Sequence, residues 1–366
     1  MLEFGTGSNV FLFYREEKTK MLAIRKMEAG PGHMACVDVL EPAVKPYTVK
    51  IKIVYCGICG SDYHIIDGYE TPGAPRQYPL TLGHEFSGTI SEIGEGVTNF
   101  NIGDRVTSLV TVNYCGHCLS CLKGEFFSCA NAKNMGYECD GTMTDYVVVP
   151  AAGVFKLPDS VSFEEGAQVE PACIAGNAVL EKVRIKPNDT TVIMGSGPIG
   201  LLILQFVKLC GGKAIVIDLS REAKKLELAQ KFGADYILEN DKCDAVTEVR
   251  KLTLGKGADF LFECSAVESC INQSSLMVRA RGAFVELGIT PPTGTMFNFF
   301  LLLVMQGIDV LCSFGHLPPM WEKVIELMAE KKINTKDLIT HKFSYQQFEE
   351  AFSCRGPEKV KVLLHP

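Results

Sequence analysis

The chain has 366 residues, of which 47% are hydrophobic and 22% charged, and its formal net charge is −7 at pH 7. This composition is typical of a globular protein with two or three domains and excludes a disordered chain. No basic run is present, and the longest mostly apolar stretch, 297–305, is too short to span a bilayer. We therefore expect neither nucleic acid nor a membrane as a partner.

The first residues and the cysteines bear on the cellular compartment. Residues 1–20 carry no motif and are interpreted as an extension, in which a short apolar cluster at 10–14 is followed by charged residues at 15–18. This is not the pattern of a secretory signal. Fifteen cysteines in a chain of this size then indicate reduced thiols, some of them bound to metal. The expected compartment is the cytoplasm.

Short β-rich runs broken by glycine, proline and aspartate extend from residue 21 to about 150, for example at 49–55, 88–93 and 146–149. Runs of this length and composition predict strands. We therefore expect the first part of the chain to form a compact β-rich domain.

Potential metal ligands are scattered along this part of the chain and just beyond it, at Cys59, His84, Glu85 and Glu170. A soft thiolate, an imidazole and carboxylates suit a catalytic zinc that keeps one position open for a substrate. Each residue alone has an ordinary alternative as a buried thiol, a core histidine or a helix-capping acid. Only their combination indicates a metal site.

A more compact set of ligands comprises four cysteines within fifteen residues, namely Cys115, Cys118, Cys121 and Cys129. Four thiolates form the closed tetrahedral shell of a structural zinc, which has no open position for a substrate. His117 lies in the same loop, but it is superfluous once four sulfurs are present, and we interpret it as solvated.

From residue 173 to about 312, apolar strands alternate with helical patterns. The segments concerned are 191–194, 201–209, 214–217, 222–232, 236–238, 259–263 and 283–287. Alternating strands and helices predict an α/β domain with a parallel, doubly wound sheet. A helix at 320–330 and a final strand at 360–364 follow.

A glycine fingerprint joins the first of these strands to its helix and consists of Gly195, Gly197, Pro198, Ile199 and Gly200. The first glycine permits a tight turn, the second lets a pyrophosphate approach, and the third lets helix and strand pack closely. The second strand ends in Asp218, which can accept from an adenosine 2′-hydroxyl and would repel a 2′-phosphate. The alternative is an ordinary turn with a solvated acid, but in this complete context we predict NAD rather than NADP.

These motifs occur in the order found in the zinc-containing medium-chain dehydrogenases, which the chain resembles from about residue 21 to its end. The resemblance is carried by Gly57-Ile-Cys-Gly-Ser-Asp62, Gly83-His-Glu85, the four cysteines, Glu170-Pro171 and the glycine fingerprint. Within the family the chain is most similar to the polyol (sorbitol or iditol) and threonine dehydrogenase branch. In that branch a glutamate, here Glu170, replaces a cysteine ligand. Cys173 lies one helical turn further on and could be mistaken for that cysteine.

The resemblance implies an α/β protein with two domains. A GroES-like catalytic domain would cover 21–172 and be completed by 313–366, and a Rossmann NAD-binding domain would cover 173–312. The active site would lie between the two domains. The implied enzyme is a zinc-dependent oxidoreductase that transfers a hydride between NAD and a secondary alcohol or its ketone.

The resemblance also assigns roles to single residues. The catalytic zinc would bind Cys59, His84 and either Glu85 or Glu170, and the two glutamates could exchange as the coordination changes. A second structural zinc would occupy the four cysteines.

Three further residues of the implied site lie close together in the sequence. Asp62 matches a carboxylate that holds the ring of His84 in its ligating tautomer. Ser61 and His64 match a relay that carries the proton of the alcohol away through the cofactor ribose.

Two departures from sorbitol-type enzymes concern the substrate. Ile65 stands where those enzymes have a tyrosine, and Gly315-His316 stands where they have an Arg-Tyr pair. We therefore expect a polyol or a related polar small molecule other than sorbitol. His316 could face the pocket, or it could be a packed or surface histidine.

Three alternatives remain for the function. An enzyme like L-threonine 3-dehydrogenase is the nearest, a polyol-phosphate dehydrogenase is the second, and a non-catalytic zinc-binding relative belongs to a different class. The joint presence of ligands and relay argues against the last. By analogy we expect a homo-oligomer, a tetramer rather than a dimer, with the apolar segment 297–303 in its interface.

Overall fold

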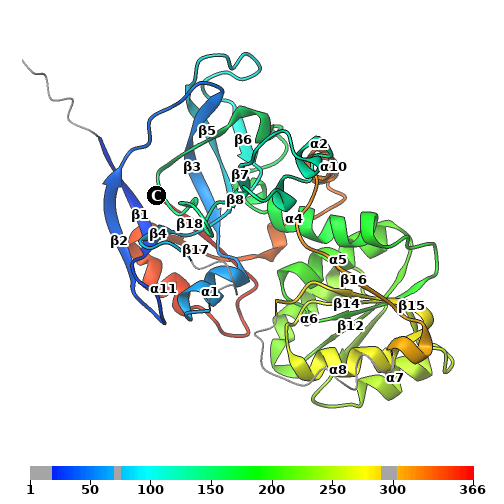
Figure 1. Cartoon of the computed structure of the whole chain (residues 1–366). Helices are drawn as coiled ribbons and strands as arrows, with labels where there is room; N and C mark the ends of the chain where they lie inside the picture. Colours follow the sequence, from blue (N-terminus) through cyan, green and yellow to red (C-terminus); the bar gives the residue numbers. More distant parts are fainter. Residues whose placement is uncertain (1–18, 70–75, 290–302) are drawn as a thin grey trace, which may run out of the picture.

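The computed structural model describes residues 19–69, 76–289 and 303–366 of the chain. Its strands form two large sheets, one in a β-rich part built from both ends of the chain and one in an α/β part built from the middle (Figure 1). The expected extension 1–20 lies outside the described residues except for its last two, and the expected interface segment 297–303 lies outside them except for Leu303.

The β-rich part is organised around a seven-stranded sheet of order β10-β6-β5-β3-β18-β17, in which β9 also pairs with β3. A three-stranded sheet, β2-β1-β4, and the pair β7-β8 complete it. Its strands are β1 (Lys20–Lys26), β2 (Met34–Leu40), β3 (Thr48–Gly57), β4 (Leu80–Thr81), β5 (Glu85–Ile93), β6 (Arg105–Ser108), β7 (Thr111–Asn113), β8 (Lys133–Asn134), β9 (Tyr146–Pro150), β10 (Val154–Lys156), β17 (Ile339–Ser344) and β18 (Lys361–His365).

Alternation of side chains explains why these segments are strands. In β9, Val147 and Val149 are buried while their neighbours are partly exposed, which is the period of two expected of a strand with one face on a core. The expected strands at 49–55, 88–93 and 146–149 correspond to β3, β5 and β9.

The last strand connects the two ends of the chain. β18 pairs antiparallel with β3, where Leu363 lies opposite Gly57, and parallel with β17. The C-terminal residues are thereby brought next to the segment that contains Cys59.

The α/β part contains a six-stranded, all-parallel sheet of order β13-β12-β11-β14-β15-β16. Numbered by their order in this domain, the strands follow 3-2-1-4-5-6, the order of the doubly wound dinucleotide-binding fold. The strands are β11 (Thr190–Met194), β12 (Lys213–Asp218), β13 (Tyr236–Glu239), β14 (Ala258–Glu263), β15 (Val278–Glu286) and β16 (Asp309–Cys312). The expected α/β fold with a parallel sheet is therefore confirmed.

The helices are α1 (Gly60–Ile66), α2 (Leu119–Leu122), α3 (Phe163–Gly166), α4 (Val169–Gly176), α5 (Pro198–Leu209), α6 (Ala223–Lys231), α7 (Ala245–Leu252), α8 (Glu268–Met277), α10 (Pro318–Ala329) and α11 (Phe348–Ser353). α7, α8 and β16 are not among the elements expected from the sequence. No helix within the described ranges is long and apolar enough to cross a membrane.

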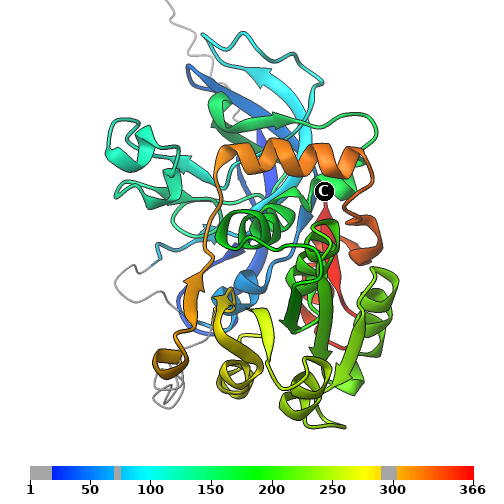
Figure 2. The same cartoon turned by 90° about the vertical axis from the view of Figure 1, so that its right-hand side faces the viewer.

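Helix α4 links the two parts of the molecule. It packs against α5 and α10, and a Cβ on its Gly176 would lie 2.9 Å from Sδ of Met320 and 3.2 Å from Cζ of Phe206. The expected domain boundary between 172 and 173 falls inside this helix, because the chain passes from one part to the other without a loop there. Figure 2 shows the chain leaving β16 and rising to α10, drawn in orange, which lies over the β-rich part.

Candidate active site

Three candidate zinc ligands converge from two segments of the β-rich part. Cys59 precedes α1, whereas His84 and Glu85 lie where β5 begins. Strand β3 pairs with β5 so that Gly57 lies opposite Glu85, which brings the two segments together. As a result, the ligand atoms of Cys59, His84 and Glu85 lie within 4.8 Å of one another.

The donor set fits a zinc ion. Ligand atoms bound to tetrahedral zinc at about 2.0–2.3 Å lie about 3.3–3.8 Å apart, which is compatible with the spacing of this cluster. Nδ1 of His84 has no hydrogen-bond partner among the described residues, so the hydrogen bond between the ring and the sulfur of Cys59 is made by Nε2, the nitrogen that would face a metal. Three protein donors also leave the fourth tetrahedral position open, as in a catalytic rather than a structural zinc site.

The charges around His84 favour a cation. Burial by itself lowers the pKa of His84, but the charge of Cys59 and a hydrogen bond to its sulfur outweigh burial and raise the pKa to about 10. The carboxylates of Asp62 and Glu170 act in the same direction. A metal ion bound at this position would take the place of the proton that these groups stabilise.

Asp62 does not hold the ring of His84 as expected. Its carboxylate is fully buried and accepts from two backbone amides, that of Cys59 at 2.8 Å and that of Gly83 at 3.3 Å. The reason is local: Asp62 lies three residues after the N-cap of α1, where a carboxylate reaches back to the cap amide. It therefore fixes the backbone beside the candidate ligands instead of orienting the imidazole.

Glu170 lies outside the cluster of three ligand atoms. It sits in the first turn of α4, is 7% exposed, and its Oε1 is 3.2 Å from Nε2 of His316. Burial raises the pKa of Glu170, but the hydrogen bond from His316 and the charges of His84 and Lys361 outweigh burial and lower it. Glu170 is therefore an ionised, buried carboxylate that already has a partner.

Cys173, on the same helix as Glu170, has different surroundings. It is fully buried in the hydrophobic core, and burial raises the pKa of its thiol well above the usual value. A neutral thiol packed among apolar side chains is not a metal ligand.

The candidate relay residues lie on α1. Ser61 and His64 are three residues apart and so share one face of the helix. Burial lowers the pKa of His64, whose ring packs edge-on against Tyr69 at 5.7 Å. The sequence did not indicate Tyr137, whose hydroxyl donates to Oγ of Ser61 at 2.6 Å and whose ring lies 5.1 Å from that of His84.

Lys361 is a second residue that the sequence did not indicate. Its ammonium group forms a buried ion pair with the carboxylate of Glu85 and donates to the carbonyl of Ile58 at 3.0 Å. The charge of Glu85 outweighs burial and raises the pKa of Lys361, which therefore stays charged. The one available signal was a lysine inside the apolar run 360–364, since a buried lysine needs a charged partner.

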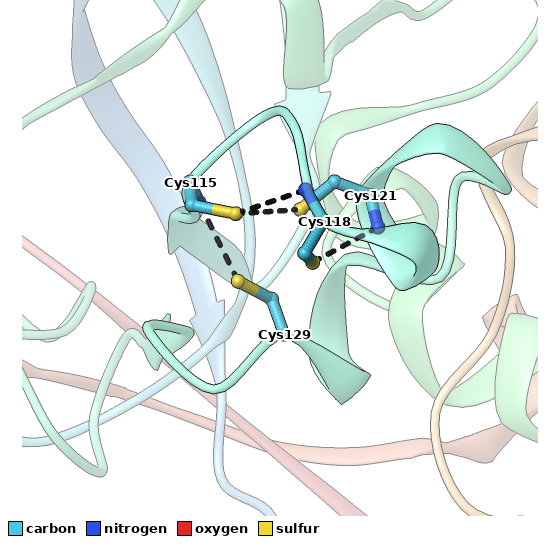
Figure 3. Close-up of side chains that lie close together, drawn as sticks. All are labelled: Cys115, Cys118, Cys121 and Cys129. Carbon is cyan, nitrogen blue, oxygen red and sulfur yellow. Dashed lines mark hydrogen bonds between the residues drawn. The ribbon is translucent and has the colours of Figure 1, made fainter.

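The four cysteines expected to bind the structural zinc form a second cluster, shown in Figure 3. Cys118 is the N-cap of α2, and the loop places the sulfurs of Cys115 and Cys121 3.8 Å apart. Four sulfurs at about 2.3 Å from a tetrahedral zinc lie about 3.8 Å from one another. The spacing thus fits a zinc ion at the centre of the cluster.

Backbone amides point at these sulfurs. The amide of Cys118 donates to Sγ of Cys115 at 3.3 Å, and the amide of Cys115 donates to Sγ of Cys129 at 3.4 Å (Figure 3). The backbone amides of His117 and Cys118 lower the pKa of Cys115 to about 6. Such donors stabilise thiolates, the form that binds zinc. The imidazole of His117 is exposed, which fits its interpretation as a solvated side chain.

The glycine fingerprint follows β11 at the point where the strand order of the parallel sheet reverses. Gly195 has a φ of +96°, which a glycine adopts without strain, and it lies beside the backbone of Ser265. A Cβ on Gly200 would lie 2.0 Å from the carbonyl oxygen of Gly195, so α5 can approach β11 only without a side chain there. A Cβ on Gly197 would meet nothing within 4 Å, which leaves open space in front of the first amides of α5.

Asp218 ends β12 beside the same loop. Its carboxylate accepts from the backbone amide of Ser196 at 2.7 Å and from the Ser196 hydroxyl at 2.6 Å, and Leu219 donates to its other oxygen at 2.7 Å. The negative charge is thus fixed next to the fingerprint, where an adenosine ribose would lie.

The two residues expected to contact substrate are both packed against protein. Ile65 is 1% exposed and belongs to the hydrophobic core of the β-rich part. Both ring nitrogens of His316 have protein partners, Glu170 and Trp321. Of the two alternatives open for His316, this is the packed histidine.

A dinucleotide-binding sheet joined to a domain with one open and one closed zinc cluster defines a nicotinamide-dependent metal oxidoreductase. Comparison with known proteins agrees with this class. Residues 45–159 match the alcohol dehydrogenase GroES-like domain, and residues 198–330 match the zinc-binding dehydrogenase domain.

Individual relatives extend over nearly the whole chain. The chain is 37% identical to a sorbitol dehydrogenase of Halalkalibacterium halodurans, over 94% of this chain and 99% of that one. It is 34% identical to a D-arabitol-phosphate dehydrogenase of Enterococcus avium, over 94% and 97%. A protein of Sinorhizobium meliloti solved with NADP bound superimposes with a TM-score of 0.86 at 29% identity, over 95% and 100%.

The chain therefore belongs to the zinc-binding medium-chain alcohol dehydrogenases, with the polyol and threonine dehydrogenases as its branch. It is an NAD-dependent alcohol dehydrogenase, and zinc and NAD are its cofactors.

Proposed function

We propose that the enzyme oxidises a secondary alcohol on a small polar molecule, such as a polyol, at a zinc held by Cys59, His84 and Glu85. The observation that carries this proposal is the cluster of these three ligand atoms within 4.8 Å, formed by buried His84 and Glu85 and half-buried Cys59, with a fourth position left open. When bound there, zinc acts as a Lewis acid that lowers the pKa of an alcohol, and NAD accepts the hydride.

The residues of this chain would bind and orient the reactants and move the proton. Because Tyr137 donates to Ser61, the hydroxyl hydrogen of Ser61 remains free for another acceptor. Ser61 can thus take a proton from a bound alcohol while passing on its own. His64, on the same face of α1, is the group that would deliver the proton to solvent.

The proposed substrate class follows from the polar character of the site and from the relatives. Sorbitol and arabitol phosphate, the substrates that the relatives' names give, carry secondary hydroxyls flanked by polar groups. The half-buried hydroxyl of Ser61 and the buried carboxylate of Glu170 would select molecules that can pair with them. Since Gly315-His316 replaces an Arg-Tyr pair, we propose a polar alcohol other than sorbitol as the best substrate.

For the cofactor we propose a preference for NAD over NADP. Asp218 is fixed beside the fingerprint by Ser196, so a 2′-phosphate would have to approach a carboxylate that cannot turn away without losing those bonds. The experiment for both proposals is the initial rate of NAD and NADP reduction with sorbitol, other sugar alcohols, their phosphates, L-threonine and diols.

The expected result of this experiment is turnover of a polyol or a related polar secondary alcohol, with NAD as the better cofactor. Cys59→Ser protein serves as the control and should be inactive with every substrate. Best activity with ethanol would contradict the proposed substrate class, best activity with sorbitol would contradict the exclusion of sorbitol, and equal kcat/KM for NAD and NADP would contradict the role of Asp218.

For assembly and location we propose a cytoplasmic homo-oligomer, a tetramer rather than a dimer. β16 lies at the end of the parallel sheet, where Val310 is 43% exposed, and in the helical segment that precedes this strand Val304 and Met305 are 79% and 77% exposed. An exposed apolar strand edge is suited to pairing with a second copy. None of the fifteen cysteines, all of which lie in the described ranges, forms a disulfide, which fits a reducing compartment. Sedimentation velocity of the intact enzyme tests the assembly, and a monomer would contradict it.

A further inference from the structure

His316 connects the candidate zinc site to the core of the protein. It lies in the segment between β16 and α10, and its Nε2 is 3.2 Å from Oε1 of Glu170. On the other side of the ring, Nε1 of Trp321 donates to Nδ1 of His316 at 2.9 Å. The side chains of His316 and Glu170 are only 7% and 9% exposed, so water does not replace either contact.

The chemistry of Trp321 determines which nitrogen of His316 carries the proton. An indole N–H can only donate, so Nδ1 of His316 must accept. In a neutral imidazole the hydrogen then lies on Nε2, which faces Glu170. The carboxylate of Glu170 thus accepts a hydrogen bond from a donor whose tautomer is fixed by a buried tryptophan.

The rings on both sides of His316 are held in place. Trp321 is fully buried and stacks on Phe155 with a centroid distance of 5.4 Å and an interplanar angle of 9°. Gly315 has a φ of +68°, and a Cβ on it would lie 2.8 Å from the ring of Phe127. The backbone before His316 and the indole after it therefore leave its imidazole little freedom to move away from Glu170.

We propose that His316 is a positioning residue that holds Glu170 through Oε1, keeps this carboxylate out of the metal-ligand set, and so leaves Glu85 as the third zinc ligand. The proposal rests on the proposed zinc site and concerns which of the two glutamates binds there. Both glutamates have a partner, Lys361 for Glu85 and His316 for Glu170, but only the carboxylate of Glu85 lies within 4.8 Å of the other two ligand atoms, whereas His316 holds Oε1 of Glu170 outside that cluster. Without His316, the cations left near Glu170 are the metal and Lys361, and because Lys361 is already paired with Glu85, the metal is the one that Glu170 would approach.

The test uses full-length enzyme with Co²⁺ in place of zinc at the catalytic site. The visible absorption of Co²⁺ reports its ligand set, and a chelator reports how fast the metal is released. In H316L, Glu170 loses its donor and joins the metal as a further ligand, so the absorption bands change and metal release becomes slower. In H316Q, the side-chain amide can still donate to Glu170 and accept from Trp321, so both readings stay as in the unmodified enzyme.

Two further variants separate this role from packing. The double variant H316L/E170Q should return to the unmodified spectrum and release rate, because an uncharged amide is a poor metal ligand. M320L is the packing control: it repacks the same turn of α10 at nearly constant volume and should change neither reading.

Three results would overturn the proposal: an H316L spectrum equal to the unmodified one, faster rather than slower release in H316L, or the same change in M320L. The zinc site itself is tested separately by C59S, which should lose the catalytic Co²⁺ spectrum. A C59S enzyme that keeps this spectrum would refute the proposed zinc site. If C59S loses the spectrum but the spectrum of H316L equals that of the unmodified enzyme, the zinc site stands and only the role of His316 is refuted.

Discussion

Separate substitution of two glycines in the fingerprint should distinguish cofactor binding from folding. Gly197 has a φ of −65° and a ψ of 180°, a conformation open to any residue, and a Cβ on it would meet nothing within 4 Å. Gly200 is different, because a Cβ there would lie 2.0 Å from the carbonyl oxygen of Gly195 and 3.3 Å from Cγ2 of Ile193. The first position is free only while no cofactor is bound, whereas the second is occupied by the protein itself.

The expected magnitudes follow from these distances. In G200A the backbone of α5 or of the fingerprint must move, and overpacking of this kind costs about 1–3 kcal/mol of unfolding free energy. In G197A the folded chain meets no clash, and the loss of unfolded-chain freedom should stabilise it by about 0.4–1 kcal/mol. The new methyl group, however, fills space that the pyrophosphate needs, and about 1–3 kcal/mol of overpacking there weakens NADH binding by about 5- to 150-fold.

Two measurements check the reasoning. Urea unfolding can be followed by the fluorescence of Trp321, the only tryptophan of the chain, which is fully buried in the same hydrophobic cluster as Leu201 of α5. NADH affinity can be measured from the fluorescence of the bound nicotinamide. The reasoning would be refuted by a G197A enzyme that binds NADH as tightly as the unmodified one, or by a G200A enzyme of unchanged stability.

Three further predictions concern the metals, the cofactor and the proton. C59S should lose turnover but stay folded with one zinc per chain, whereas C118S should lose the structural zinc and melt at a lower temperature. Metal analysis measures the zinc content of each variant, and thermal melting measures its stability. An active enzyme that contains no zinc would contradict both expectations. D218N keeps a polar partner for Ser196 but removes the negative charge. If the unmodified enzyme prefers NAD, the ratio of kcat/KM for NAD to kcat/KM for NADP should fall by about 10- to 100-fold in this variant. Burial lowers the pKa of His64, so its ring is neutral and can accept a proton at and above neutral pH. Somewhat below neutral pH, a fraction of the rings is still neutral. H64A should therefore slow alcohol oxidation by on the order of 100-fold near pH 7 and much less in alkaline buffer, where solvent takes the proton; an unchanged pH–rate profile would show another route.

Features that lie within a short stretch of sequence could be predicted from it. The four cysteines lie within fifteen residues, so one loop can bring them together whatever the rest of the fold. The glycine fingerprint and Asp218 belong to one strand–helix–strand unit, whose hydrophobic periodicity is a local property. Of the elements missed in the same domain, two have a weak local signal: α8 (Glu268–Met277) is rich in serine and polar residues, and β16 (Asp309–Cys312) has only four residues. The third, α7 (Ala245–Leu252), was missed although Asp244 caps its N-terminus.

Contacts between distant segments were decided by the tertiary structure alone. Lys361 reaches Glu85 only because β18 pairs with β3, and Tyr137 reaches Ser61 from a loop that follows β8. The sequence could propose His316 as a pocket residue or a packed one, but no pattern in it shows that α10 places Trp321 against the ring and α4 places Glu170 on the other side. Hydrogen bonds between side chains depend on orientations within a few tenths of an ångström, and these are fixed by packing of elements far apart in the chain, not by the residues next to them.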